Sequence, residues 1–181
     1  RVDGVPDSWK WLYDSDKYAG RIALLGSPGT VLQVGCKYKG WPLNEKDPAK
    51  LEQVAELLIK QKKNIKVFAE DNGQDLLLSG EVDLTMEWNG DILQVMAEDK
   101  DISYVVPKEG GLLWEDTLAI ADFIQYATPN AAAKALMKPD YTGNPAIFPS
   151  DEVIARCETA IYQGPEYTQL VDRLWTRIGA A

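Results

Sequence analysis

The chain has 181 residues, of which 45% are hydrophobic and 26% charged, a composition typical of a globular protein with one domain or two small lobes. Its net charge of −9, from 28 acidic and 19 basic side chains, argues against nucleic-acid binding, which needs a basic surface. Histidine is absent, so the commonest general base and the commonest metal ligand are both missing. This counts against most hydrolytic sites, though not against carboxylate or lysine chemistry. We expect a non-enzymatic protein without a metal or a cofactor, and an enzyme is the weakest alternative.

The printed sequence contains no pattern typical of a membrane span or of a secretory leader. No apolar run approaches the roughly 18 residues that suggest a membrane span. It begins with neither Met nor a basic-then-apolar leader, so we expect that any secretory signal was removed or never encoded. Cys36 and Cys157 fit no zinc or redox spacing. Free thiols are favoured over one disulfide, because Cys36 stands among apolar residues of a predicted helix.

Along the first two thirds of the chain, predicted strands and helices alternate. After an aromatic-rich lead-in over residues 9–20, the predicted strands are 21–25, 65–69, 82–88, 102–106 and 117–120. The predicted helices between them are 28–39, 48–62, 73–79 and 90–97. Asp47 followed by Pro48 is a strong helix start, with a capping residue before a proline in the first turn. This alternation predicts an α/β fold with a mostly parallel sheet.

Beyond residue 121 the pattern becomes helical. Helices are predicted over 131–137, 151–161 and 166–178, and no strand is predicted there. We therefore divide the chain into an α/β ligand-binding lobe over residues 1–120 and a helical C-terminal segment over 121–181.

Aromatic and acidic side chains stand together where predicted strands end. Trp88 ends the strand 82–88 and Asp91 opens the next helix. Trp114 and Asp116 are two residues apart and project to the same side if the chain is extended. Ligands of open α/β sheets bind beyond the carboxyl ends of the strands. Because carboxylates neutralise an organic cation and aromatic rings attract it, we expect a small, multiply charged amine as the ligand.

Ordinary structural roles remain open for the same residues. Trp88 and Trp114 can be packed rings, and Asp91 can simply favour the helix dipole. Tyr126 can be a packed side chain, and Glu109 is expected to be a solvated turn residue.

Several segments, in chain order, resemble the polyamine-binding proteins of bacterial ABC importers, the periplasmic spermidine/putrescine-binding family. These segments are residues 8–9, 17–21, 79–82, 88–91, 107–111, 116–120, 126–130 and 147–149. The resemblance implies a type II periplasmic-binding-protein-like fold, whose two α/β lobes, each a mixed and mostly parallel sheet flanked by helices, close on the ligand by a hinge. It also implies a periplasmic location and a membrane permease as partner.

The resemblance further implies roles for particular side chains. Trp88 and Trp114 would stack on the methylene chain of a polyamine, while Asp91 and Asp116 would pair with its ammonium groups. Polar contacts from the other lobe would come from Tyr126 and Gln163.

The chain also departs from the family pattern. Thr30 stands where the family has an acidic residue that faces the ligand, and the N-terminal half of the family is missing. The chain therefore resembles a second lobe joined to a shortened C-terminal segment. A fragment, an engineered chain and a remodelled relative stay open, as do a separate first lobe and self-association. We expect weak or no polyamine binding by the chain alone; the alternatives are another small amine or zwitterion, or a structural lobe without a ligand.

Overall fold

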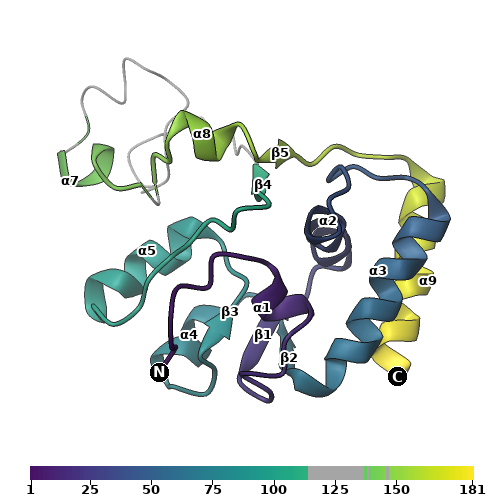
Figure 1. The fold of residues 1–181 in the computed structure, drawn as a ribbon, viewed down its shortest axis with the longest axis horizontal. Helices are drawn as coiled ribbons and strands as arrows, with labels where there is room; N and C mark the ends of the chain where they lie inside the picture. The colour runs from purple at the N-terminus through teal and green to yellow at the C-terminus, as the bar shows by residue number, and fades with distance from the viewer. Residues whose placement is uncertain (114–136, 138, 146) are drawn as a thin grey trace.

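A three-stranded parallel sheet forms the centre of the computed structural model, which describes residues 1–113, 137, 139–145 and 147–181 (Figure 1). Its strand order is β2–β1–β3, with β1 at Ile22–Leu25, β2 at Ile65–Ala69 and β3 at Leu84–Thr85. All four residues of β1 are buried, and Ile22 opposes both Ile65 and Leu84. A central strand covered on both faces is apolar at every position, which accounts for the uninterrupted apolar run of β1.

Helices flank this sheet, and a short second sheet lies apart from it. The helices are α1 Lys10–Tyr13, α2 Pro28–Tyr38, α3 Pro48–Gln61, α4 Gly73–Leu78, α5 Asn89–Glu98, α7 Pro139–Thr142, α8 Asp151–Ile154 and α9 Pro165–Ala180, with a 3₁₀ turn η1 at Lys62–Asn64. The second sheet pairs β4, Leu112–Leu113, with β5, Glu158–Thr159, in parallel. In Figure 1, α3 and α9 lie side by side at one end of the molecule and α5 lies towards the other.

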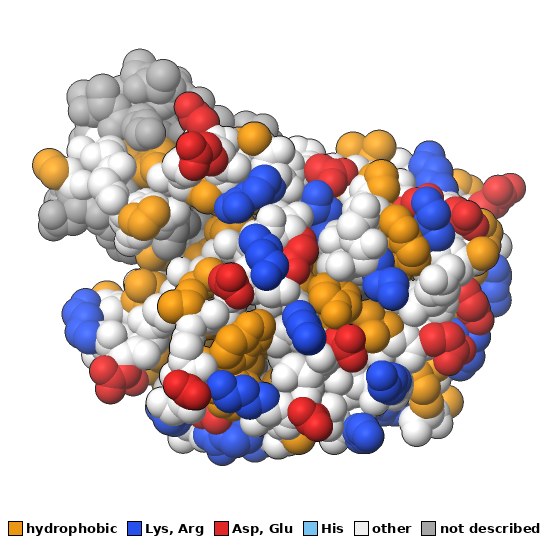
Figure 2. Space-filling model, viewed as in Figure 1, with side chains coloured by type: hydrophobic (Ala, Val, Ile, Leu, Met, Phe, Trp, Pro, Cys, Tyr) orange, Lys and Arg blue, Asp and Glu red, His pale blue; other side chains and the backbone are white. Residues whose placement is uncertain are grey.

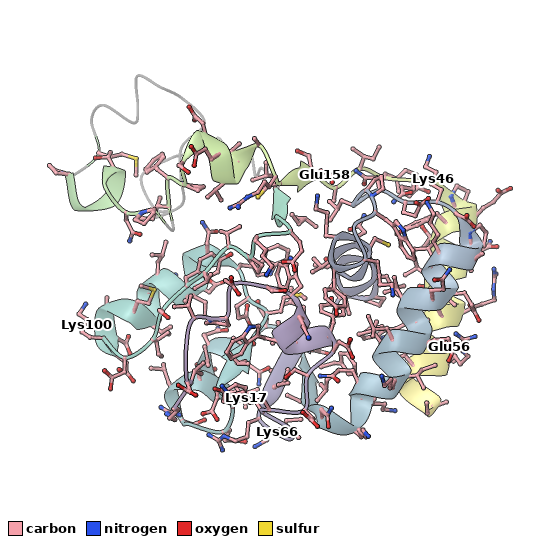
Figure 3. All side chains as sticks on the ribbon, viewed as in Figure 1. Lys17, Lys46, Glu56, Lys66, Lys100 and Glu158 are labelled. Carbon is pink, nitrogen blue, oxygen red and sulfur yellow. The ribbon has the colours of Figure 1, made fainter. Side chains whose placement is uncertain are left out.

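The α3–α9 pair closes one side of the core. Asp47 caps α3 by accepting a hydrogen bond from the Ala49 amide at 2.9 Å, as the Asp47–Pro48 start predicted. From α9, Leu174 and Ile178 enter the same cluster of buried side chains as the α3 residues. On the outside of the pair, Arg177 Nη2 lies 3.1 Å from Glu56 Oε1, and the Glu56 side chain points outward in Figure 3.

Most predicted elements of the α/β part are confirmed. The strands 21–25 and 65–69 and the helices 28–39, 48–62, 73–79 and 90–97 correspond to β1, β2 and α2 to α5 within two residues at each end. The helix 166–178 corresponds to α9.

The strand predicted over 82–88 is wrong in length. Only Leu84–Thr85 pairs with β1, although Val82, Leu84 and Met86 are buried as the alternation predicts. Glu87 contradicts the alternation, because only 8% of it is exposed although its position predicts the polar face.

The strand predicted over 102–106 is also wrong. Residues 102–106 have no regular secondary structure, and the next strand, β4, begins at Leu112 after the turn at Pro107. Ile102, Tyr104 and Val106 are partly buried, so packing rather than strand pairing explains their apolar run.

The helix predicted over 151–161 is too long, and the expectation of no strand beyond residue 121 is wrong. α8 ends at Ile154, and β5 follows. The Glu158 amide donates to the Gly111 carbonyl at 3.1 Å, so pairing with β4 replaces the helical hydrogen bonds. The predicted strand 117–120, most of the predicted helix 131–137 and the division at residue 120 lie outside the described residues.

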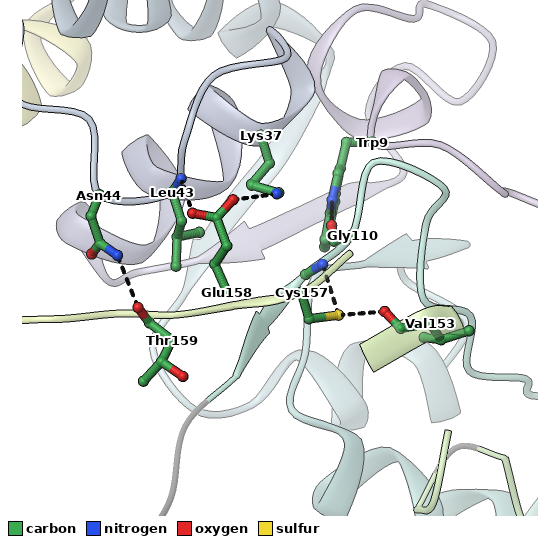
Figure 4. A network of polar contacts seen from close by, with 10 residues as sticks. Trp9, Lys37, Leu43, Asn44, Gly110, Val153, Cys157, Glu158 and Thr159 are labelled. Carbon is green, nitrogen blue, oxygen red and sulfur yellow. Dashed lines mark hydrogen bonds and ion pairs between the residues drawn. The ribbon is translucent and has the colours of Figure 1, made fainter. Parts of the chain in front are cut away.

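Both cysteines are free thiols. Cys36 is buried in α2, and burial raises its pKa to about 12. Cys157 Sγ accepts a hydrogen bond from the Gly111 amide at 3.3 Å and donates one to the Val153 carbonyl at 3.4 Å (Figure 4).

The surface mixes charges of both signs. On the face shown in Figure 2, acidic and basic side chains are interspersed with hydrophobic ones, and no single basic area stands out. Within the described ranges, every helix is too short or too polar to cross a bilayer.

Candidate functional site

The residues that follow the three central strands meet at one edge of the sheet. Because the strands are parallel neighbours, their carboxyl ends point the same way. Thr30, in the first turn of α2, follows β1, and Asp71 follows β2. Trp88 and Asp91 follow β3. We call Thr30, Asp71, Glu87, Trp88 and Asp91 the strand-end edge.

Trp88 and Asp91 both belong to the start of α5. Trp88 is the N-cap residue, with φ −74° and ψ 139°, and its partly buried ring packs against the core. Asp91 lies in the first turn and is partly buried. A carboxylate there is stabilised by the positive end of the helix dipole. Trp88 and Asp91 are thus both partly buried and stand at the same helix end.

Thr30 has a hydroxyl group at the start of α2. Ser27 Oγ donates to Thr30 Oγ1 at 3.0 Å, and both residues stand at the start of α2. Residues 26–30 contain no carboxylate, so the negative charge of the edge comes from the residues after β2 and β3.

The sequence did not indicate the role of Glu87. Its carboxylate accepts hydrogen bonds from the Gly73 amide at 3.0 Å and from the Trp88 amide at 3.2 Å. Asn72, the N-cap residue of α4, makes no side-chain cap, so Glu87 satisfies the first amide of that helix from a distant part of the chain. The one signal for this role in the sequence was a glycine at the start of a predicted helix. In the structure, a Cβ at Gly73 would overlap Glu87 Oε1.

The electrostatics of this edge are negative. Burial raises the pKa of Glu87 above its ordinary value, and the charges of Asp91 and Asp71 raise it further, while the two backbone hydrogen bonds act in the opposite direction. Acidic groups beside the exposed part of an indole ring provide what an organic cation needs, charge neutralisation and a π-face.

Gln163 lies elsewhere. It stands two residues before α9, where its amide group is buried near the Tyr167 hydroxyl. The start of α9 and helix α5 lie on opposite sides of α2 in Figure 1. Gln163 thus lies against Tyr167 of α9, while Thr30, Trp88 and Asp91 belong to the strand-end edge.

Trp114, Asp116 and Tyr126 lie outside the described residues. β4 ends at Leu113, directly before Trp114.

A hollow of about 470 Å³ lies away from the strand-end edge, beside the loop that follows α2. Its lining residues are Lys37, Tyr38, Gly40, Trp41, Pro42, Glu109 and Glu158. Its carboxylates already have protein partners. Glu158 lies 2.5 Å from Lys37 Nζ and accepts from the Leu43 amide at 3.0 Å (Figure 4).

Glu109 belongs to the same polar structure and is not the solvated turn residue expected. It accepts hydrogen bonds from Ser8 Oγ at 2.5 Å and from the Trp9 amide at 3.2 Å. Trp9 Nε1 donates to the Gly110 carbonyl at 2.7 Å (Figure 4). These contacts hold segments distant in sequence together, so the hollow is a structural junction.

Groups of three or more side chains suited to a metal ion are absent from the described part of the chain. The carboxylates and the ring of the strand-end edge are groups that can bind an organic cation reversibly.

Known proteins with similar sequences share this architecture. The bacterial extracellular solute-binding protein family matches residues 3–148. The spermidine/putrescine-binding periplasmic protein of Salmonella typhimurium is 29% identical over 196 residues, covering 90% of this chain and 56% of that protein. The corresponding protein of Escherichia coli is 30% identical over 183 residues, covering 87% of this chain and 51% of its own length. The chain thus spans about half the length of the curated relatives it matches.

A solved structure of a similar protein has a similar fold. The spermidine/putrescine ABC transporter substrate-binding protein PotD of Streptococcus pneumoniae superposes with a TM-score of 0.85 at 25% identity, over 99% of this chain and 63% of that chain. The fold is that of type II periplasmic binding proteins, as the resemblance implied. With the family matched over residues 3–148, the chain belongs to the bacterial extracellular solute-binding proteins, a family of binding proteins rather than enzymes.

Proposed function

We propose that this chain binds polyamines such as putrescine and spermidine for uptake by an ABC importer. The observation that carries the proposal is the strand-end edge, where the Trp88 ring stands at the same helix start as Asp91 and next to the buried Glu87. A polyamine needs an apolar wall for its methylenes and carboxylates for its ammonium groups. The names of the Salmonella and Escherichia relatives support the same ligand class. A periplasmic location and a membrane permease as partner belong to the same proposal.

Three more side chains complete the proposed site. Trp114 would add a second ring, Asp116 a second carboxylate and Tyr126 a hydroxyl, as the resemblance implies. All three come after β4, which ends at Leu113, and they lie outside the described residues. The role of Gln163 and the division into residues 1–120 and 121–181 also remain proposals from the resemblance.

We expect the 181-residue chain to bind weakly by itself. Solute-binding proteins gain affinity by closing two lobes on the ligand, which excludes water and strengthens each ion pair. Exposed pairs contribute only about 0–1 kcal/mol each. A dissociation constant of roughly 10 μM or weaker, near −7 kcal/mol, is the expected result. A separate first lobe, or self-association through the same face, would bring a second wall to the ligand.

Calorimetric titration with putrescine and spermidine, at low and physiological salt, tests the proposal. Saturable binding that weakens with salt is expected, because salt screens exposed ammonium–carboxylate pairs. Trp88→Ala, Asp91→Asn and Asp116→Ala should each reduce it. The matched control is Glu98→Gln, which removes one carboxylate from the exposed far end of α5 and should leave binding unchanged. A flat titration of a folded sample, even in the presence of a first lobe from a relative, contradicts the proposal.

A second candidate ligand is a zwitterion, such as an amino acid, and Thr30 favours it. The resemblance implies that the hydroxyl of Thr30 replaces a family carboxylate, which would remove one acidic contact to a diamine. Stronger binding of an amino acid than of putrescine would select this ligand class. If titrations are flat for both and sedimentation depends on concentration, the chain is instead a self-associating lobe.

A further inference from the structure

We infer that Glu87 is a positioning residue for the ligand site, whose buried carboxylate joins the start of α4 to the Trp88 backbone and makes cation binding at the strand-end edge depend on pH. The inference rests on the proposed function, because it concerns the cation that Trp88 and Asp91 would hold.

The geometry makes Glu87 a bridge between two helix starts. One carboxylate oxygen accepts from the Gly73 amide, the first residue of α4, at 3.0 Å. The other accepts from the Trp88 amide, at the N-cap of α5, at 3.2 Å. Both carboxylate oxygens thus hold backbone amides in place. Because the Trp88 ring is attached to one of these backbone positions, its orientation depends on Glu87.

The space for this carboxylate is provided by Gly73. A Cβ at that position would overlap Glu87 Oε1 and lie 2.7 Å from Thr85 Oγ1. Only 8% of Glu87 is exposed, so water cannot replace the two amide donors. The Glu87 carboxylate is needed as a hydrogen-bond acceptor at this position, because an apolar residue would leave the Gly73 amide unsatisfied.

The charges around Glu87 have the same sign as its own. Asp71, after β2, and Asp91, in α5, both oppose its ionisation, and Tyr104, from the segment after α5, faces it as well. Asp75, in the first turn of α4, is exposed to solvent. Among the described residues, no Lys or Arg forms an ion pair with Glu87. A cation bound beside Trp88 and Asp91 would supply the missing positive charge.

The sign of the pH effect follows from linkage. Burial raises the pKa of Glu87, so its proton is bound at a higher pH than that of an ordinary glutamate. A bound cation favours the ionised carboxylate and lowers this pKa, and by reciprocity protonation of Glu87 weakens cation binding. Affinity is therefore full above the pKa of Glu87 and falls as the pH decreases through it.

The test follows the amide resonances of Gly73 and Trp88 by NMR while the pH is lowered, with and without excess putrescine. Both amides should titrate with one shared midpoint above about 4.3, the ordinary value of a glutamate. Putrescine should lower this midpoint by about 0.5 to 1 unit, which equals a three- to tenfold loss of affinity on protonation. Glu87→Gln should abolish the shared midpoint, and Glu98→Gln should preserve it.

The outcomes separate this inference from the proposed function. Separate midpoints for the two amides, or none, overturn the bridging role whether or not a polyamine binds. Binding by calorimetry without any shift of a shared midpoint leaves Glu87 as a helix cap only and overturns the coupling. Equal pH profiles of putrescine affinity in the parent chain and in folded Glu87→Gln overturn it as well. If the midpoint is shared and no polyamine binds, the proposed function fails and the pH coupling fails with it, while the bridge stands.

Discussion

The sheet with α2, α3 and α9 differs from the chain between Asp99 and Gly164 in how it is held together. Most buried hydrophobic side chains belong to the first region, whereas Ile147 is the buried hydrophobic residue among the described part of the second. The second region is attached by polar contacts that reach across the sequence, such as Trp9 to Gly110 and Lys37 to Glu158. Burial thus stabilises one region and long-range hydrogen bonds position the other.

The largest expected effect is a cavity in the first region. Leu24→Ala removes a fully buried side chain of the central strand and should lower the free energy of unfolding by about 2–5 kcal/mol. Denaturant titration measures this loss. A loss below about 1 kcal/mol would mean that the sheet core is not the main source of stability.

A smaller loss is expected from overpacking. A Cβ at Gly35 would overlap Val54 Cγ1 and lie 3.2 Å from Tyr13 Cε1, so Gly35→Ala should cost about 1–3 kcal/mol of stability. The matched control is Gly29→Ala in the same helix, where a Cβ meets nothing within 4 Å. Adding Val54→Ala to Gly35→Ala should restore part of the loss, and the absence of any rescue would contradict the packing explanation.

The second region should respond to loss of a single hydrogen bond. Trp9→Phe removes the indole donor to the Gly110 carbonyl, worth about 1 kcal/mol. Hydrogen exchange should show faster exchange of the Glu158 amide, by about fivefold, with little change in the β1 amides. Equal acceleration in both regions would show that they unfold as one unit. Trp11→Phe, which keeps a ring stacked near Tyr18, is the control.

An ion pair makes part of the stability depend on pH. Arg21 hydrogen-bonds both oxygens of Asp83, which lowers the pKa of that carboxyl, and the Asp83 side chain is only 6% exposed. A lowered pKa in the folded state stabilises the protein above the unfolded value, near 3.9, and this contribution is lost as the pH falls through the folded value. Asp83→Asn should therefore melt below the parent chain at pH 7, with the difference vanishing in strong acid. A difference that persists at low pH would contradict this origin.

The smallest effect is expected at the surface of the second region. Ile161, with 57% of its surface exposed, is held through its backbone amide, which donates to Asn44 Oδ1 at 3.0 Å. Ile161→Ser should change the unfolding free energy by no more than about 0.5 kcal/mol. A larger loss would reveal apolar packing at this surface.

The same comparison explains what the sequence could predict. Local patterns sufficed in the first region: the Asp47–Pro48 start located α3, and the buried run located β1. They failed for β5, because its pairing with Leu112 depends on residues 46 positions away. Where a strand forms by such a distant pairing, the periodicity of its own few residues carries no signal.

The site shows the same division. The rule for parallel strand ends predicts Trp88 and Asp91 beyond the end of a strand, and both follow β3 in the structure, whereas Thr30 was named only through the resemblance. Glu87 was missed because its role depends on the absence of a side chain at Gly73, fourteen residues earlier. The position of Gln163 depends on the path of the loop before α9, and no local sequence pattern predicts that path.

The pairing of β4 with β5 has an evolutionary consequence. Leu112 and Glu158 are neighbours in register, so the chain between them leaves and returns at a single point of the surface. Sequence inserted, deleted or exchanged between two such points leaves the buried core intact. Trp114, Asp116 and Tyr126 all fall within this excursion. If the ligand contacts proposed for Trp114, Asp116 and Tyr126 are confirmed by experiment, ligand preference can diversify through one exchangeable segment while the fold is inherited unchanged.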